Sequence, residues 1–128
     1  MATTTPISSM RDAFSVAGSC VLVSGGSRGI GLGIAEAFAQ CGANVAILCR
    51  NEETGRAALE HLRQWGTNCL CVACDVADLA SVRAAVARVA DAFSRIDVLV
   101  NNAGTALIGS FLGDQDLANW HAVLGVNL

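Results

Sequence analysis

The stretch SGGSRGIG, residues 24–31, places four glycines directly after an apolar run at residues 20–23. Glycine inside a regular element costs stability, so this density needs a purpose. A turn from a strand into a helix presents unpaired N–H groups and the positive end of the helix dipole, which bind phosphate. Gly25, Gly29 and Gly31 fit the tight turn, the close approach to a pyrophosphate and the helix–strand packing of a dinucleotide site. A purely structural turn is the alternative.

Arg50 is the second candidate for chemistry, at the end of the apolar run at residues 44–49. A dinucleotide-binding unit carries an acidic residue near this place for NAD and an arginine for NADP. Positions 48–50 hold no acidic residue, and Arg28 in the glycine turn offers a second guanidinium for a 2′-phosphate. Glu52 and Glu53 are expected to open the next helix. We therefore predict NADP(H), with NAD(H) as the alternative if Arg50 is only a surface residue.

Hydrophobic periodicity predicts the elements that position these residues. Buried strands are expected at residues 20–24, 44–49, 68–74 and 96–100. Helices are expected at residues 29–41 and 52–65, from Asp78 to about Phe93, and from near Asp114 onward. The predicted apolar stripe of the first helix is Ile30, Ile34, Ala37, Phe38 and Cys41. This alternation indicates an α/β fold, a Rossmann-like doubly wound parallel sheet with helices on both faces.

Composition limits the partners and the compartment. Residues 1–14 are predicted to be a polar tail, and residues 15–128 one dinucleotide-binding domain. A net charge of −3 argues against nucleic acid, and no apolar stretch approaches the roughly 20 residues that cross a bilayer. The start of the chain lacks the pattern of a signal peptide, so a cytoplasmic location is expected. The Ser/Thr-rich start with one arginine leaves a mitochondrial address as the alternative.

The cysteines and histidines predict no metal site. Cys20, Cys49, Cys69 and Cys71 lie in apolar runs, where a free cysteine behaves as a small hydrophobic residue. The run CLCVAC at residues 69–74 has no second cluster of ligands with zinc spacing. We interpret these residues as reduced, buried thiols. The two histidines, His61 and His121, are expected at the surface.

Four motifs follow one another in the chain: the Gly-x-x-x-Gly-x-Gly turn, CDV at residues 74–76, NNAG at residues 101–104 and WHAVLGVNL at residues 120–128. Together they resemble the short-chain dehydrogenase/reductase family, over Cys20 to Leu128. The resemblance implies the strand order 3-2-1-4.

The resemblance also implies cofactor contacts beyond Gly25, Gly29, Gly31, Arg28 and Arg50. Within the turn it adds Ser24, where the family more often has threonine, and also Ser27 and Ile30. Asp75 would accept a hydrogen bond from the adenine amino group beside the Val76 backbone. The residues expected to line the ribose are Asn101, Ala103 and Gly104. Asn102 is expected to make structural hydrogen bonds, and Trp120 to pack in the core.

In this family hydride transfer depends on Asn, Ser, Tyr and Lys, of which Asn127 matches the first. Tyrosine exchanges a proton with the substrate oxygen, and lysine lowers its pKa. This sequence contains no tyrosine, and its eight basic residues are all arginine. An acid tuned from a pKa near 10 cannot be built from what remains.

We therefore expect the cofactor-binding part of an NADP(H)-dependent oxidoreductase for a carbonyl or alcohol substrate, incomplete at its C-terminus and inactive alone. One alternative is a non-catalytic NADP(H)-binding or regulatory module, and another is a product without a dinucleotide role that folds only in an assembly. The strand IDVLV, residues 96–100, would form an edge with one charge and no proline. We expect it to pair with another polypeptide, either a second copy or the remaining half of the fold, or else to aggregate.

Overall fold

The computed structural model describes residues 9–106 and 117–128. Its strands are β1 (Cys20–Ser24), β2 (Asn44–Cys49), β3 (Cys69–Ala73) and β4 (Val98–Val100). Its helices are α1 (Met10–Ala13), α2 (Gly29–Gln40), α3 (Glu52–Arg63), α4 (Leu79–Phe93) and α5 (Leu117–Asn127). The predicted start of the last helix near Asp114 lies outside the described residues.

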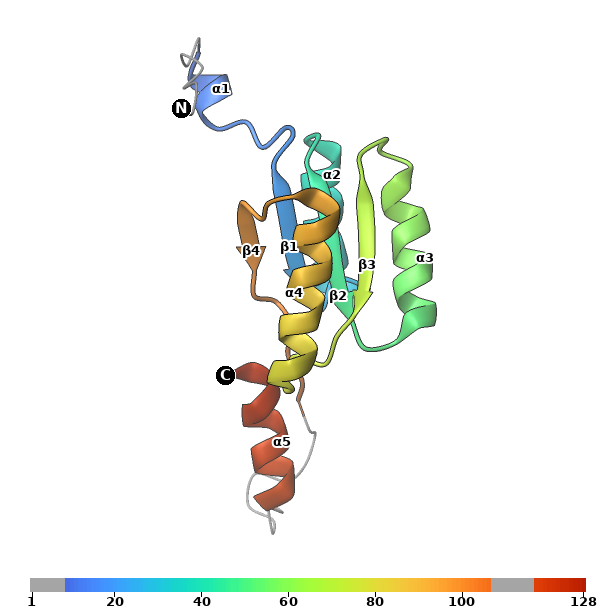
Figure 1. The fold of residues 1–128 in the computed structure, drawn as a ribbon, viewed down its shortest axis with the longest axis vertical. Helices are drawn as coiled ribbons and strands as arrows, with labels where there is room; N and C mark the ends of the chain where they lie inside the picture. The colour runs from blue at the N-terminus through green and yellow to red at the C-terminus, as the bar shows by residue number, and fades with distance from the viewer. Residues whose placement is uncertain (1–8, 107–116) are drawn as a thin grey trace.

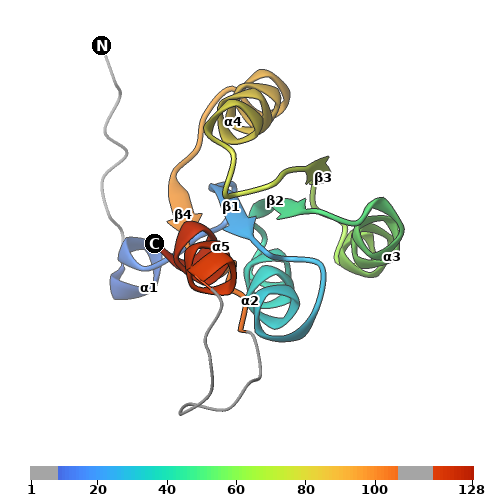
Figure 2. The same ribbon diagram turned by 90° about the horizontal axis from the view of Figure 1, so that it is seen from below.

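The four strands form one parallel sheet in the order β3-β2-β1-β4, which confirms the predicted α/β topology (Figure 1). Viewed along the strands, α2 and α3 cover one face and α4 covers the other (Figure 2). α5 lies beyond the carboxyl ends of the strands (Figure 1). In a doubly wound sheet this end carries the ligand site, so the fold places the glycine turn where a cofactor binds.

Two apolar clusters hold the helices to the sheet. Under α2 and α3 the buried strand side chains include Val21, Val45 and Ile47. Under α4 they include Leu22 and Val72. The side chains of β1 and β2 point alternately to the two faces of the sheet, and helices cover both faces. These strands are therefore continuous apolar runs in the sequence.

Helix α2 differs from the predicted stripe. Its buried residues are Gly31, Ala35 and Ala39, whereas Ile30 is 78% exposed. Small residues four positions apart let the helix lie close to β1 and β2, and larger apolar side chains sit beside that line. The predicted stripe is therefore about one position out of register. The sequence pattern gives large apolar side chains more weight than glycine and alanine, although the small residues are the buried ones.

Other differences concern the ends of elements. The predicted polar tail includes one turn of helix, α1. α3 ends at Arg63, so Trp65 lies beyond it and is 41% exposed. β4 spans three residues rather than five; just before it, the Asp97 carboxylate accepts from the amide of Cys20 at 2.8 Å. Trp120 was expected in the core but is 56% exposed on α5.

Candidate functional site: a cleft at the carboxyl ends of the strands

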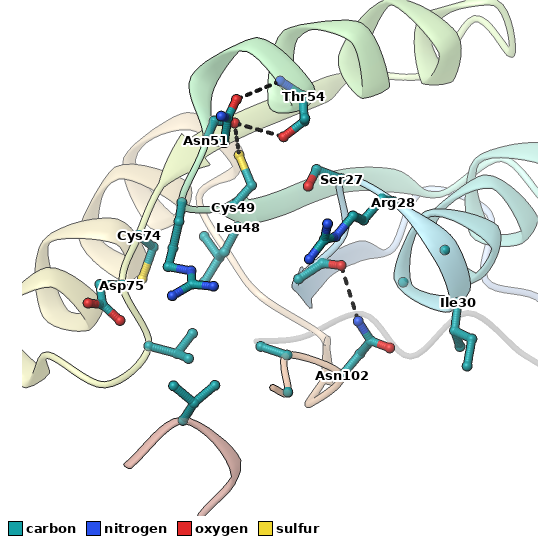
Figure 3. Close-up of a pocket in the computed structure, with 18 residues that line it drawn as sticks. Ser27, Arg28, Ile30, Leu48, Cys49, Asn51, Thr54, Cys74, Asp75 and Asn102 are labelled. Atoms are coloured by element: carbon teal, nitrogen blue, oxygen red, sulfur yellow. Dashed lines mark hydrogen bonds between the residues drawn. The ribbon is translucent and has the colours of Figure 1, made fainter. Parts of the chain in front are cut away.

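A cleft of about 750 Å³ opens where β1, β2 and β3 end. Residues from six segments line it: the glycine turn, the end of β2, the start of α3, the end of β3, the loop after β4 and the end of α5 (Figure 3). The lining residues are Gly25, Ser27, Arg28, Gly29, Ile30, Gly31, Leu48, Cys49, Arg50, Asn51, Thr54, Cys74, Asp75, Val76, Asn102, Ala103, Gly104 and Val126. Its volume suits a ligand of cofactor size.

Two glycines of this region, Gly25 and Gly31, are packed so tightly that a side chain at either would disrupt it. Gly25 has φ +65°, and a Cβ built there would lie 3.0 Å from the Cα of Ala103. A Cβ on Gly31 would collide with the carbonyl oxygen of Gly25 and the side-chain amide of Asn102. The turn, the start of α2 and the loop after β4 therefore form one close-packed unit.

Hydrogen bonds from Asn102 and Ser24 hold this unit together. The Asn102 Nδ2 donates to the carbonyl oxygen of Ser24 at 2.9 Å. It also donates to the carbonyl oxygen of Gly25 at 3.1 Å (Figure 3). The Ser24 Oγ accepts from the amides of Asn102 and Ala103, each at 3.0 Å. The structure confirms the structural role expected for Asn102. Ser24 is buried and lies outside the cleft lining, so its hydroxyl positions the loop after β4.

The first residues of α2, Gly29, Ile30 and Gly31, line the cleft. Its N-cap residue, Arg28, makes no side-chain capping bond. By contrast, Asn51 caps α3 through Thr54, and Asp78 caps α4 through Ala80, as predicted for Asp78. The first amides of α2 therefore have no side-chain cap, and they lie beside the glycine turn that lines the cleft.

Two guanidiniums and one carboxylate give the cleft its charge. Arg28 and Arg50 both line it, and neither forms an ion pair within the residues that the structure describes. Asp75 is the one carboxylate in the lining, at the end of β3, where its Oδ1 accepts from the amide of Ala77 at 3.0 Å. The end of β2 thus presents a cation and no carboxylate to the cleft.

Nearly all the predicted cofactor residues meet in this cleft. The exceptions are Ser24, described above, and Asn101, which is exposed outside it. Sequence reasoning missed Leu48, Cys49, Asn51, Thr54, Cys74 and Val126 as lining residues. All but Val126 lie at or just after the carboxyl end of β2 or β3, so proximity to those ends was the available signal. Val126 had none.

Asn127, the predicted catalytic residue, lies at the end of α5. Its Oδ1 accepts from the Thr105 amide at 2.8 Å, and its Nδ2 donates to the Thr105 carbonyl oxygen at 2.9 Å. Asn127 is exposed and does not line the cleft, whereas its neighbour Val126 does. Asn127 therefore anchors the loop after β4 to α5.

All six cysteines are free thiols. Within residues 9–106 and 117–128, no group of three or more histidine, cysteine or acidic side chains is placed to hold a metal ion. No helix in that part of the chain is long and apolar enough to cross a membrane.

A parallel sheet of order 3-2-1-4 and a glycine turn opening α2 at its carboxyl end define a Rossmann-type dinucleotide-binding fold. The family described as short chain dehydrogenase matches this sequence over residues 19–128. The chain therefore belongs to the short chain dehydrogenase family.

Individual relatives agree with this assignment. Oxidoreductase UcpA of Salmonella typhimurium is 47% identical over 95 residues, which is 74% of this chain and 36% of the relative. The crystal structure of a short chain dehydrogenase from Burkholderia cenocepacia in complex with NADP superposes with a TM-score of 0.83 at 43% identity, over 89% of this chain and 46% of that one. A family member from Burkholderia phymatum in complex with NAD gives 0.84 at 30% identity, over 90% of this chain and 41% of that one. The chain spans less than half the length of each of these proteins.

Proposed function

We propose that this chain supplies the adenosine- and pyrophosphate-binding part of an NADP(H)-dependent oxidoreductase, which moves a hydride between the nicotinamide and a carbonyl or alcohol substrate. The observation that carries this proposal is the start of α2. Its N-cap makes no side-chain bond, and neither Gly25 nor Gly31 beside it has room for a Cβ. A pyrophosphate supplies the acceptors and the negative charge that such a terminus favours.

The charges in the cleft favour NADP(H) over the alternative, NAD(H). A ribose 2′-OH is recognised by a carboxylate at the end of the second strand, and a 2′-phosphate by arginine. Here the end of β2 contributes Arg50, and Arg28 lines the same cleft. The Burkholderia cenocepacia relative, solved in complex with NADP, supports this choice, whereas the Burkholderia phymatum relative shows that the family also takes NAD.

The remaining cofactor roles follow the family pattern. Asp75 would accept from the adenine amino group beside Val76, and Ala103 and Gly104 would lie under the ribose. Asn127 would orient water in the proton relay. Because the sequence contains neither tyrosine nor lysine, we propose that this chain alone binds cofactor without turning it over. The same absence favours the second candidate, a non-catalytic NADP(H)-binding or regulatory module.

The exposed edge of the sheet supports a partner polypeptide. β4 pairs only with β1 among the described strands, and Leu99 is 57% exposed. We propose that residues 96–100 pair with a further polypeptide, either a second copy in a homo-oligomer or the C-terminal half of the family fold. The free thiols support a reducing, cytoplasmic compartment.

The test is a titration of NADPH into the purified chain, followed by the change in nicotinamide fluorescence. We expect saturable binding that 2′,5′-ADP competes away and nicotinamide mononucleotide does not, because the described cleft holds the adenosine half of the site. Competition by the mononucleotide alone, or no binding of NADPH, would refute the proposal.

A further inference from the structure

Two thiols face each other beside the cleft. The sulfurs of Cys49 and Cys71 lie 3.3 Å apart, within hydrogen-bonding distance. The residues sit on neighbouring parallel strands, where Cys49 pairs with Ala73 and Cys71 pairs with Ile47, so the two cysteines form a diagonal pair. A disulfide needs about 2.05 Å between sulfurs, so a small approach of the two side chains joins them.

Helix α3 is shaped around this thiol pair. A Cβ on Gly55 would lie 2.5 Å from both sulfurs, so only glycine leaves room for them. Gly55 is buried, and its amide donates to the carbonyl oxygen of Asn51 at 3.0 Å. A movement of either sulfur therefore displaces Gly55 and with it the first turn of α3.

A second cavity, of about 240 Å³, gives small molecules access to the pair. Both cysteines line it, together with Glu52, Arg56, Leu59, Ala73 and Arg88. Cys49 also lines the cofactor cleft, so its side chain separates the two hollows. An oxidant in the second cavity therefore contacts Cys49, a residue that also lines the cofactor cleft.

The hydrogen bonds give the two thiols different roles. The Cys49 thiol donates to the carbonyl oxygen of Asn51 at 3.3 Å (Figure 3). Burial, the hydrogen bond to Cys49 and the charges that Cys49 and Glu52 can carry together raise the pKa of Cys71 to about 12. Cys71 therefore keeps its proton, so Cys49, which lines both hollows, makes the first attack on a peroxide.

We propose that Cys49 and Cys71 form a reversible disulfide through which hydroperoxides weaken binding at the adenosine end of the cleft. This inference rests on the proposed cofactor function of the cleft. The Cys49 thiolate attacks the peroxide oxygen, the O–O bond breaks, and a sulfenic acid and hydroxide form. The Cys71 sulfur then attacks the Cys49 sulfur, the S–O bond breaks, and water leaves with the Cys71 proton. Overall, two thiols and one hydrogen peroxide give one disulfide and two waters, and a dithiol reverses the change.

Closure of the disulfide acts on the cleft through Asn51. The Cys49 thiol loses the proton that it donates to the Asn51 carbonyl oxygen. Asn51 lines the cleft directly after Arg50 and holds α3 through two bonds to Thr54, both at 3.0 Å (Figure 3). Loss of one such bond predicts an affinity about three- to tenfold weaker for 2′,5′-ADP.

The experiment uses the full chain with Cys41→Ser, because Cys41 is exposed and would form disulfides between chains. After hydrogen peroxide and thiol blocking, we expect peptide mapping to show a 49–71 disulfide that dithiothreitol removes. We expect the affinity for 2′,5′-ADP to fall by the factor above and to recover on reduction. Cys71→Ser should abolish both effects, whereas Cys69→Ser, on the same strand, should keep both.

Absence of the 49–71 disulfide after peroxide would overturn the proposal, as would an unchanged affinity once it has formed. If the reduced chain binds no 2′,5′-ADP, the proposed function fails by itself. The coupling is then measured by hydrogen exchange at the amides of Thr54 and Gly55, which bond to Asn51. Faster exchange after oxidation supports the proposal, and unchanged exchange contradicts it.

Discussion

The side-chain amide of Asn102 donates a 3.1 Å hydrogen bond to the carbonyl oxygen of Gly25, and so ties the loop after β4 to the glycine turn after β1. A second bond, to the Ser24 carbonyl oxygen, doubles this link. The glycine turn is therefore held by a residue 77 positions further along the chain.

Asn102→Ala should destabilise the fold and weaken NADPH binding together. The substitution leaves part-buried carbonyl oxygens without their donor, which costs about 1–3 kcal/mol in the free energy of unfolding. Urea denaturation measures this change. Asn101→Ala, at the exposed neighbouring position, should stay within about 0.5 kcal/mol of the wild type. Equal losses in the two variants would show that the Asn102 bonds are not what holds the turn.

Gly31→Ala should displace the glycine turn, because the new Cβ collides with the Gly25 carbonyl oxygen and the Asn102 amide. We expect a loss of about 1–3 kcal/mol in stability, with loss of NADPH binding. Gly33→Ala is the matched control, since a Cβ at Gly33 meets nothing within 4 Å on the same helix. That variant should gain about 0.5–1 kcal/mol and bind normally. Normal binding by Gly31→Ala would contradict this account of the turn.

The Asp97 carboxylate should make the free energy of unfolding depend on pH. It accepts hydrogen bonds from the Arg95 Nε and from the Cys20 amide, each at 2.8 Å. Both bonds lower the pKa of Asp97, and the bond from Arg95 has the larger effect. A lowered folded-state pKa contributes stability that is present above the unfolded pKa, near 4, and is lost as pH falls through the folded value.

Asp97→Asn should therefore lower the melting temperature at pH 7, and the gap to the wild type should close as the pH drops below about 4. Melting curves by circular dichroism across this range measure the gap. Asp91→Asn, an exposed change on α4, should show little difference at either end. A gap for Asp97→Asn that stays constant with pH would disprove the link.

The glycine turn could be predicted because its residue types are local: a strand, a helix and the glycines between them all lie within residues 20–40. The α2 face could not, because Gly31, Ala35 and Ala39 carry a weaker hydrophobic signal than Ile30, Ile34 and Phe38, even though they are the buried residues of the helix. Ser24 was predicted to contact cofactor, but its bonds to Asn102 and Ala103 depend on a loop 78 positions away. Contacts between such distant residues follow from the order of the strands in the sheet. Local sequence patterns do not give that order, which is expected only from the resemblance to a family.

The purified chain should show no dehydrogenase or reductase turnover, because no tyrosine is present to act as the proton donor. A screen of carbonyl and alcohol substrates with NADPH and NADP, followed by absorbance of the reduced nicotinamide, measures this. Turnover that Asn127→Ala abolishes would mean that this chain builds a proton relay of another kind.

We propose that Arg50 makes this cleft a site for the phosphorylated cofactor, and calorimetric titration with 2′,5′-ADP and 5′-AMP measures this selectivity. We predict that the wild-type chain prefers 2′,5′-ADP by about 1–3 kcal/mol, the value of a hydrogen bond to a charged group. Arg50→Asp should reverse that preference, whereas Arg63→Asp, a charge change at the far end of α3, should leave it intact. Equal affinity of the wild-type chain for the two nucleotides would contradict the claim.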